Sequence, residues 1–411
     1  MNVRNYALVT AAYWAFTMTD GALRMLVLLH FHNLGYNALT LAFLFLLYEF
    51  FGIVTNLYGG WLGARFGLNR TLIAGLAIQI VALMGLSFVG PDWVAWLSVA
   101  WVMLAQALSG IAKDLTKLSS KSAIKLIVGG KDSTEHNSAL FKWVALLTGS
   151  KNALKGLGFF VGGVLLQWMG FREGLWLMAA ALGLVLIASA IMLGNSLGTA
   201  SSKAKLRSIF SKSTAINRLS AARIFLFGAR DVWFVVGLPL YLYTVLEWSF
   251  EGVGGFMAAW VIGYGFVQAA APKLLSNMRS EISAARIWSF LLALVTIGIA
   301  TAVSMNVAPE TAIIVGLIVF GMVFAVNSSL HSFLILAYTK RSDVAMDVGF
   351  YYSANAAGRL IGTLVSGLSY LLGGVEACMW VSAGFLIVNW LLSLGFTPLA
   401  DDRSDSKTAS V

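Results

Sequence analysis

Twelve hydrophobic spans constrain the fold of this sequence more than any other feature. They cover residues 6–30, 38–62, 70–90, 93–120, 140–168, 172–194, 218–246, 252–275, 284–305, 309–338, 347–373 and 375–397. Each is long enough to cross a bilayer as a helix, which takes about 20 residues. Hydrophobic residues make up 59% of the chain, charged residues 11%, and the mean hydropathy is +0.82. The sequence therefore predicts an all-α membrane protein with twelve transmembrane helices.

A polar, basic and Ser-rich segment between the sixth and seventh spans divides the chain into two halves. We expect a six-helix bundle at 1–195, a linker at 196–216, a second six-helix bundle at 217–397 and a tail at 398–411. Eighteen of the 28 Lys and Arg residues fall on the side of the termini, and one, Arg172, falls on the opposite side. The positive-inside rule then places both termini and the linker in the cytoplasm. It also explains the net charge of +10 without a nucleic-acid partner.

The two halves show signs of an internal repeat. A shift of 204 residues places Lys155 on Arg359, and a shift of 211 places Asp20 on Asp231. The shift of 204 also aligns three glycines of each half, which are Gly158, Gly163 and Gly170 with Gly362, Gly367 and Gly374. Either these matches are a chance result of Gly-rich membrane helices, or the halves are pseudo-symmetric bundles. Parallel repeats predict a transporter whose substrate lies between the bundles.

Apart from the charges assigned to the two membrane surfaces, the spans contain nine cations but only four acids, Asp20, Glu49, Asp114 and Asp231. The cations are Arg24, Lys113, Lys117, Lys142, Lys151, Lys155, Arg223, Arg230 and Arg359. Three of these, Lys117, Lys142 and Arg223, lie near predicted cytoplasmic ends, where long side chains can extend to the surface. The others are candidates for function, because a charge inside a membrane is costly.

Span five carries the densest cationic face. Lys151 and Lys155 lie one helical turn apart, with Asn152 beside them, and four glycines occupy other faces. Together with Arg359, the equivalent residue of the other half, they predict a binding site for an anion with more than one negative charge. The alternative is that each lysine pairs with a carboxylate, although five cations would then still lack one.

Spans one and seven each combine an arginine with an aspartate. Asp20 and Arg24 share a polar stripe in span one, and Arg230 precedes Asp231 directly in span seven. In one interpretation these are structural ion pairs. In the other, Arg24 and Arg230 bind the substrate and an aspartate carries a proton or holds an arginine in place.

Further polar residues of the spans complete the predicted site. Lys113 of span four is expected to line the cavity, and Tyr352 and Asn355, on the face of Arg359, are expected to supply neutral hydrogen bonds. Glu49 and His331 are each either proton-coupling residues or structural ones.

The motifs of an energy-coupled enzyme or a metal site are missing from the sequence. It has no G-x-x-x-x-G-K-[ST] and no H-E-x-x-H, and one Cys and four His residues are too few for a typical metal centre. We therefore expect no enzymatic activity, no cofactor and no metal, and transport driven by an ion gradient or by substrate exchange.

The loop "GGWLGARFGLNR", residues 59 to 70, resembles the signature loop of the major facilitator superfamily, of the type G-x-L-x-D-R-x-G-x-[RK]-[RK]. The matching positions include Gly60, Arg65, Gly67 and Arg70, whereas Ala64 replaces the Asp of the family. With twelve spans and a central linker, this resemblance implies the major facilitator fold.

Four longer stretches resemble the ArsJ family of organoarsenical efflux permeases from bacterial arsenic-resistance operons. They are "TDGALRMLVLLHFHNLGY", "LYEFFGIVTNLYGGWLGARFG", "ARDVWFVVGLPLYLY" and "WVIGYGFVQAAAPK". The resemblance implies export of 1-arseno-3-phosphoglycerate, which glyceraldehyde-3-phosphate dehydrogenase makes from arsenate and glyceraldehyde 3-phosphate. It thus implies a functional partnership with that dehydrogenase and a place in the bacterial inner membrane, and we expect a monomer.

Three other functions remain open from the sequence. An organophosphate exchanger and a proton-coupled drug exporter would share the fold, although an exporter of lipophilic cations would need an excess of carboxylates. A transporter-like receptor would bind the anion without moving it.

Overall fold

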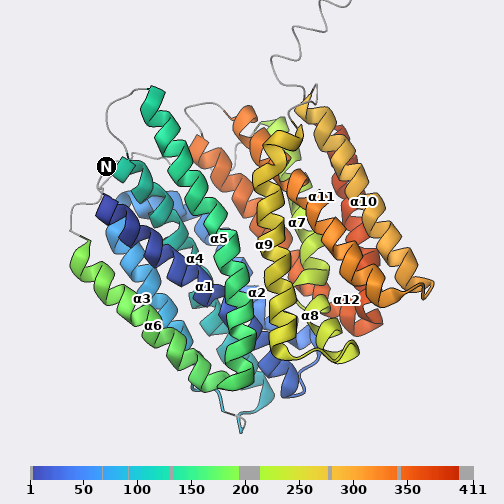
Figure 1. The fold of residues 1–411 in the computed structure, drawn as a ribbon, viewed down its shortest axis with the longest axis horizontal. Helices are drawn as coiled ribbons and strands as arrows, with labels where there is room; N and C mark the ends of the chain where they lie inside the picture. Colours follow the sequence, from blue (N-terminus) through green and yellow to red (C-terminus); the bar gives the residue numbers. More distant parts are fainter. Residues whose placement is uncertain are drawn as a thin grey trace, which may run out of the picture. The chain divides into compact units, whose positions relative to one another are not determined.

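The computed structural model describes residues 3–66, 68–90, 92–128, 134–193, 213–275, 280–339 and 344–397. Within these residues the regular structure is helical (Figure 1). The helices are α1 (Val3–Asn33), α2 (Ala38–Phe66), α3 (Leu68–Leu86), α4 (Ala95–Val128), α5 (Thr134–Trp168), α6 (Phe171–Met192), α7 (Thr214–Phe234), α8 (Gly237–Leu240), a π-helical turn (Tyr241–Val245), α9 (Phe250–Leu275), α10 (Glu281–Ser304), α11 (Pro309–Tyr338) and α12 (Val344–Leu394).

These helices confirm the predicted all-α membrane fold. Nine stretches of the described residues are long and apolar enough to cross a bilayer. One of them, residues 347–394 in α12, contains two predicted spans, because its backbone leaves the helical conformation at Gly373 and Gly374. α1 and α5, with 31 and 35 residues, cover the two remaining spans and carry most of the candidate charges of the first half.

Two glycines that the shift of 204 aligned form sharp turns in the structure. Gly170, between α5 and α6, has a φ of 90°, and Gly374, inside α12, has a φ of 61° and a ψ of −152°. Residues with a Cβ rarely adopt either conformation. Equivalent positions of the two halves therefore require glycine for the same reason.

The contacts between residues divide the chain into two compact units. Unit 1 contains Met1–Lys205 and Leu242–Ile262, and unit 2 contains Leu206–Tyr241 and Gly263–Val411. The predicted division into two bundles of six spans stays a prediction, because residues 242–262 come from the second half of the sequence.

In unit 1, α1 packs against α5 and α6, α2 against α4, and α3 against α4 and α6. The approach of α1 to α5 depends on small residues: a Cβ added at Gly158 or Gly162 would collide with the backbone oxygen of Met18 or Ala22. On another side of α5, a Cβ added at Gly156 would lie 2.8 Å from the backbone oxygen of Ala258 in the first half of α9. Glycine thus lets the backbones of two helices, α1 and α9, come into contact with α5.

In unit 2, α12 packs along α7 and α10, and α10 packs against α11. The approach of α12 to α7 repeats the geometry of unit 1. A Cβ at Gly362 would lie 2.6 Å from the backbone oxygen of Gly228, and one at Gly358 would collide with that of Ile224. Gly362 is the residue that the shift of 204 aligned with Gly158, so the structure supports the internal repeat.

The chain is also interrupted where α7 ends. α7 stops at Phe234, α8 begins at Gly237, and the hydroxyl oxygen of Ser366 accepts hydrogen bonds from the backbone N–H groups of Val236 and Gly237, both at 3.2 Å. A side chain of α12 therefore satisfies donors that the break leaves without a helical partner.

Candidate functional site

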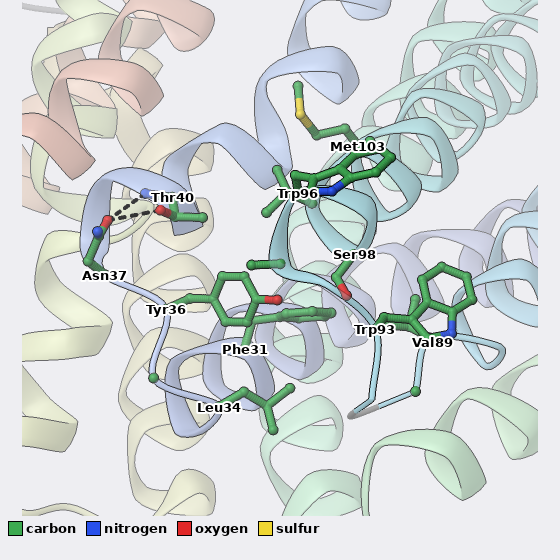
Figure 2. Close-up of a pocket in the computed structure, with 15 residues that line it drawn as sticks. Phe31, Leu34, Tyr36, Asn37, Thr40, Val89, Trp93, Trp96, Ser98 and Met103 are labelled. Carbon is green, nitrogen blue, oxygen red and sulfur yellow. Dashed lines mark hydrogen bonds between the residues drawn. The ribbon is translucent and has the colours of Figure 1, made fainter.

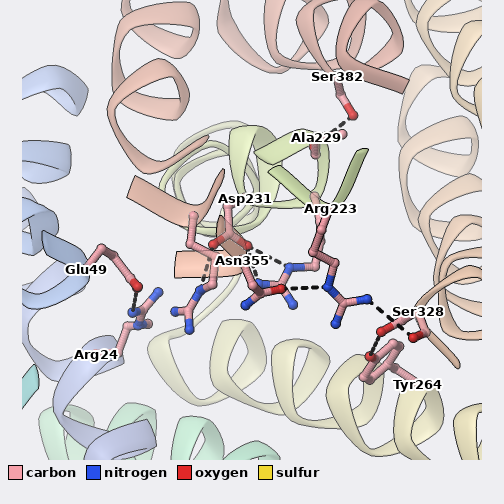
Figure 3. Close-up of polar contacts among 11 residues, drawn as sticks. Arg24, Glu49, Arg223, Ala229, Asp231, Tyr264, Ser328, Asn355 and Ser382 are labelled. Atoms are coloured by element: carbon pink, nitrogen blue, oxygen red, sulfur yellow. Dashed lines mark hydrogen bonds and ion pairs between the residues drawn. The ribbon is translucent and has the colours of Figure 1, made fainter. Parts of the chain in front are cut away.

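Arg24 of α1 and Glu49 of α2 form a buried ion pair in unit 1. Nη2 of Arg24 lies 2.9 Å from Oε1 of Glu49, and the two side chains are 6% and 0% exposed (Figure 3). The guanidinium also lies 5.3 Å from the ring centres of Phe45 and Tyr48. This geometry joins α1 to α2 and neutralises both charges inside the unit.

Tyr48 links three further charged residues of unit 1. Its hydroxyl donates a hydrogen bond to Oδ1 of Asp20 at 2.5 Å, and Nζ of Lys155 lies 3.7 Å from Oδ2 of the same carboxylate. The ammonium of Lys113 lies 4.0 Å from the centre of the Tyr48 ring, a cation–π contact. We call Asp20, Tyr48, Lys113 and Lys155 the Tyr48 cluster. It brings together side chains of α1, α2, α4 and α5.

Lys151 and Asn152 are partly exposed on α5, one turn before Lys155. The neighbouring Ser150 accepts a hydrogen bond from Nε1 of Trp14 in α1 at 2.8 Å. Lys117, for which the sequence indicated a surface position, is only partly exposed, lies 3.5 Å from Asp114 and donates to Asn56 at 3.1 Å. One of the four acids of the spans therefore pairs with Lys117.

Asp231 organises a second cluster, in unit 2. Its carboxylate is fully buried and binds both Arg230, whose Nε lies 2.6 Å from Oδ1, and Arg359 of α12, whose Nε lies 3.2 Å from Oδ2. The two arginine side chains are 15% and 16% exposed. We call these three residues the Asp231 cluster. It holds two positive charges against one negative charge.

The two clusters repeat one ion pair. Lys155 of α5 pairs with Asp20 of α1, and Arg359 of α12 pairs with Asp231 of α7. These are the residues that the shifts of 204 and 211 had aligned. Each half of the chain thus places a cation and a carboxylate at equivalent positions inside its apolar helices.

Other predicted residues of unit 2 lie around Arg223. Asn355 accepts a hydrogen bond from Nε of Arg223 at 2.9 Å, as Figure 3 shows. Tyr352 is partly exposed, with its ring 5.6 Å from that of Tyr351, and His331 is fully buried. Arg223 itself is 4% exposed, so its side chain does not extend to the surface, as its position near a predicted cytoplasmic end would have allowed.

The predicted conformational loop lies largely outside the described side chains. Gly60 and Arg65 fall within α2, and Arg70 is exposed at the start of α3. Gly67 lies outside the described residues.

The structure also has a cavity of about 680 Å³ in unit 1. Figure 2 shows aromatic side chains in its wall, including Phe31, Tyr36, Trp93 and Trp96. None of its lining residues is charged, and none belongs to the predicted site. Within the described part of the chain, no group of three His, Cys, Asp or Glu residues is placed to hold a metal.

Sequence reasoning missed two residues, Tyr48 and Arg223. Tyr48 stands directly before Glu49. Its ring contacts the cations Arg24 and Lys113, and its hydroxyl binds Asp20. Arg223, Phe227 and Arg230 follow one another at helical spacing, four and three residues apart, and this stripe was a usable signal.

Charged side chains inside a bundle of apolar helices are typical of a membrane transporter. The family comparison gives the same class: the model of the Major Facilitator Superfamily matches residues 7–333. The chain therefore belongs to the Major Facilitator Superfamily and is a multi-pass membrane transporter.

Solved structures give the same fold. A crystal structure of the nucleoside transporter NupG matches with a TM-score of 0.71 and 14% identity, covering 96% of this chain and 99% of that chain. A POT family transporter in complex with a thioalcohol conjugated peptide matches with a TM-score of 0.73 and 13% identity, over 95% of each chain. One in complex with 5-aminolevulinic acid has a TM-score of 0.73 and 13% identity, over 96% and 97%. Among curated proteins, none matches this sequence significantly.

Proposed function

We propose that this transporter exports an anionic organoarsenical, 1-arseno-3-phosphoglycerate, and thereby confers resistance to arsenate. The resemblance of four stretches to organoarsenical efflux permeases supports the identity of the substrate. The charge of the clusters supports its class, because the transported molecule carries a phosphate at one end and an arsenate ester at the other.

The observation that carries the proposal is the repeated ion pair. In each half, a carboxylate holds a cation in place inside the apolar helices, and Asp231 shares its charge between two arginines. An incoming phosphate or arsenate oxygen binds Lys155 or Arg359, either in place of the carboxylate or beside it. Arginine suits this exchange, since its planar fork matches a tetrahedral oxyanion at two oxygens.

Transport then follows from alternating access of two bundles. The protein takes up the anion at the cytoplasmic face of the bacterial inner membrane, where glyceraldehyde-3-phosphate dehydrogenase supplies it, and releases it outside. The residues that we assign to substrate binding in the first half are Arg24, Lys113, Lys151, Asn152 and Lys155. Those in the second half are Arg230, Tyr352, Asn355 and Arg359. The pairing of Arg24 with Glu49 means that the substrate competes with a carboxylate there as well.

The test is uptake of arsenic into everted vesicles that contain the protein. The outer medium supplies arsenate, glyceraldehyde 3-phosphate, the dehydrogenase and its nicotinamide cofactor, and each component is left out in turn. We expect uptake only when every component is present, because arsenate itself is not the substrate. Uptake of arsenate without the dehydrogenase would refute the assignment.

An organophosphate exchanger is the main competitor, since it would use the same cations. Vesicles preloaded with phosphate and supplied with glycerol 3-phosphate distinguish the two functions. Exchange of these two anions, with no uptake of arsenic from the complete mixture, would replace our proposal with that function.

A further inference from the structure

Arg223 forms a polar site in unit 2 that is separate from the Asp231 cluster. It lies on α7 seven residues before Arg230, which corresponds to about 10 Å along a helix. Its Nε donates to Oδ1 of Asn355 at 2.9 Å, and its Nη1 donates to the backbone oxygen of Ser328 at 3.3 Å. The ring centres of Phe227 and Tyr351 lie 3.9 Å and 5.0 Å from its guanidinium carbon. All of these partners are neutral.

The positive charge of Arg223 is not balanced by a carboxylate, unlike the charges of the other arginines of the site. Arg24, Arg230 and Arg359 each contact a carboxylate, whereas no ion pair is formed by Arg223 within the described residues. An arginine stays protonated in proteins, and a buried charge without a counter-charge is unfavourable. The aromatic faces offset only part of this cost. The site therefore favours an anion.

His331 supplies an independent sign of a missing partner. It follows Ser328 by one turn of α11 and is fully buried, and neither of its ring nitrogens has a hydrogen-bond partner in the described structure. Ser328 also accepts at its hydroxyl from Tyr264 at 3.2 Å (Figure 3). Buried polar atoms normally have partners, and a polar ligand would supply one here.

We infer that Arg223, Ser328, His331 and Asn355 form a second anion-binding station, which takes a phosphate or similar oxyanion group of the substrate. The ring of Phe227 contacts both this station and the Asp231 cluster, because the guanidinium carbons of Arg223 and Arg230 lie 3.9 Å and 4.9 Å from its centre. Arg223 lies nearer the end of α7 that follows the linker, which is predicted to be cytoplasmic. The station therefore receives the anion before it reaches Arg230 and Arg359.

This order of events depends on the proposed export, but binding of an anion at Arg223 does not. The test therefore measures binding of glycerol 3-phosphate, which contains no arsenic, to the purified full-length protein by calorimetry. The background is an Arg230→Gln/Asp231→Asn/Arg359→Gln variant, in which the Asp231 cluster has lost its cations together with the carboxylate that would otherwise stay buried without a partner. We expect binding to persist in this background and to weaken at least tenfold when Arg223→Gln is added.

Two further variants separate binding from a structural role of Arg223. Asn355→Asp places a carboxylate at 2.9 Å from Arg223 without removing any side chain, so it should keep the fold while weakening anion binding by a similar factor. Arg218→Gln is the matched control, because Arg218 is an exposed arginine of α7 bonded to the backbone oxygen of Gly395, and it should leave binding unchanged.

The outcomes are distinct from those for the proposed function. If Asn355→Asp binds glycerol 3-phosphate as tightly as its parent, Arg223 is a structural brace and the station is refuted, even if Arg223→Gln fails to fold. If Arg223-dependent binding is present but the vesicles take up no arsenic, the station stands and the assigned substrate is wrong.

Discussion

Replacing Arg359 with Gln removes one of the two cations that bind the Asp231 carboxylate. The carboxylate keeps Arg230 as a partner, with Nε at 2.6 Å, so the substitution does not leave a buried charge unpaired. The fold should therefore survive. What is lost is the cation that we assign to the substrate.

The size of the effect follows from the contact that is lost. A hydrogen bond to a charged group contributes about 1.5–3 kcal/mol, and a factor of ten in affinity corresponds to about 1.4 kcal/mol. The apparent KM for the anion should therefore rise roughly tenfold to a hundredfold. The 16% exposure of the Arg359 side chain places the expectation toward the lower end, since water screens the interaction.

The assay is the initial rate of arsenic uptake into everted vesicles at graded substrate concentrations, normalised to the amount of protein in the membrane. Arg359→Lys is the control, because it keeps the charge but loses the fork, and its KM should fall between those of the wild type and Arg359→Gln. An unchanged KM in Arg359→Gln would refute the assignment of this cation to the substrate.

Three further predictions concern stability. Glu49→Gln leaves Arg24 buried without its carboxylate and should lower the free energy of unfolding by about 3–5 kcal/mol, measured by denaturant titration in detergent. Gly162→Ala places a Cβ against the backbone of Ala22 and should cost about 1–3 kcal/mol, measured as a lower melting temperature. Gly374→Ala forces a Cβ into a backbone conformation that only glycine readily adopts and should cost about 1–3 kcal/mol, measured in the same way.

Matched controls exist for these substitutions. Gly183 and Gly384 are helical glycines at which an added Cβ meets nothing within 4 Å, so Gly183→Ala and Gly384→Ala should be neutral or stabilising. Equal melting temperatures for Gly162→Ala and Gly183→Ala would contradict the close packing of α1 on α5. If the Glu49→Gln variant is as stable as the wild type, the burial of the Arg24 charge does not require the Glu49 carboxylate.

The spans could be predicted because bilayer thickness fixes the length of an apolar helix. Even the break in α12 was predicted, as the boundary between the spans at 347–373 and 375–397. The partners of the intramembrane charges could be predicted only in part. The repeat aligned Lys155 with Arg359 and Asp20 with Asp231, but it did not show that the members of each half contact each other.

What the sequence lacked was the rotation of each helix, which packing against neighbours determines. Tyr48 became central because α2 turns it toward Asp20 of α1 and Lys113 of α4, whereas its sequence position offered only the adjacent Glu49. Arg223 lies near the start of α7, where the sequence allowed its side chain to extend to the surface. In the structure, α11 and α12 cover it, and its side chain extends along Phe227 instead of toward the membrane surface.

The central claim is that the protein moves an arsenate group and a phosphate group together, as one anion. The most direct measurement supplies everted vesicles with radiolabelled arsenate and phosphate-labelled glyceraldehyde 3-phosphate, together with the dehydrogenase and its cofactor, and counts both labels in the same vesicles. Our account predicts that arsenic and phosphorus accumulate in equal amounts and at the same initial rate. Accumulation of arsenic without phosphorus, or of phosphorus without arsenic, would contradict it.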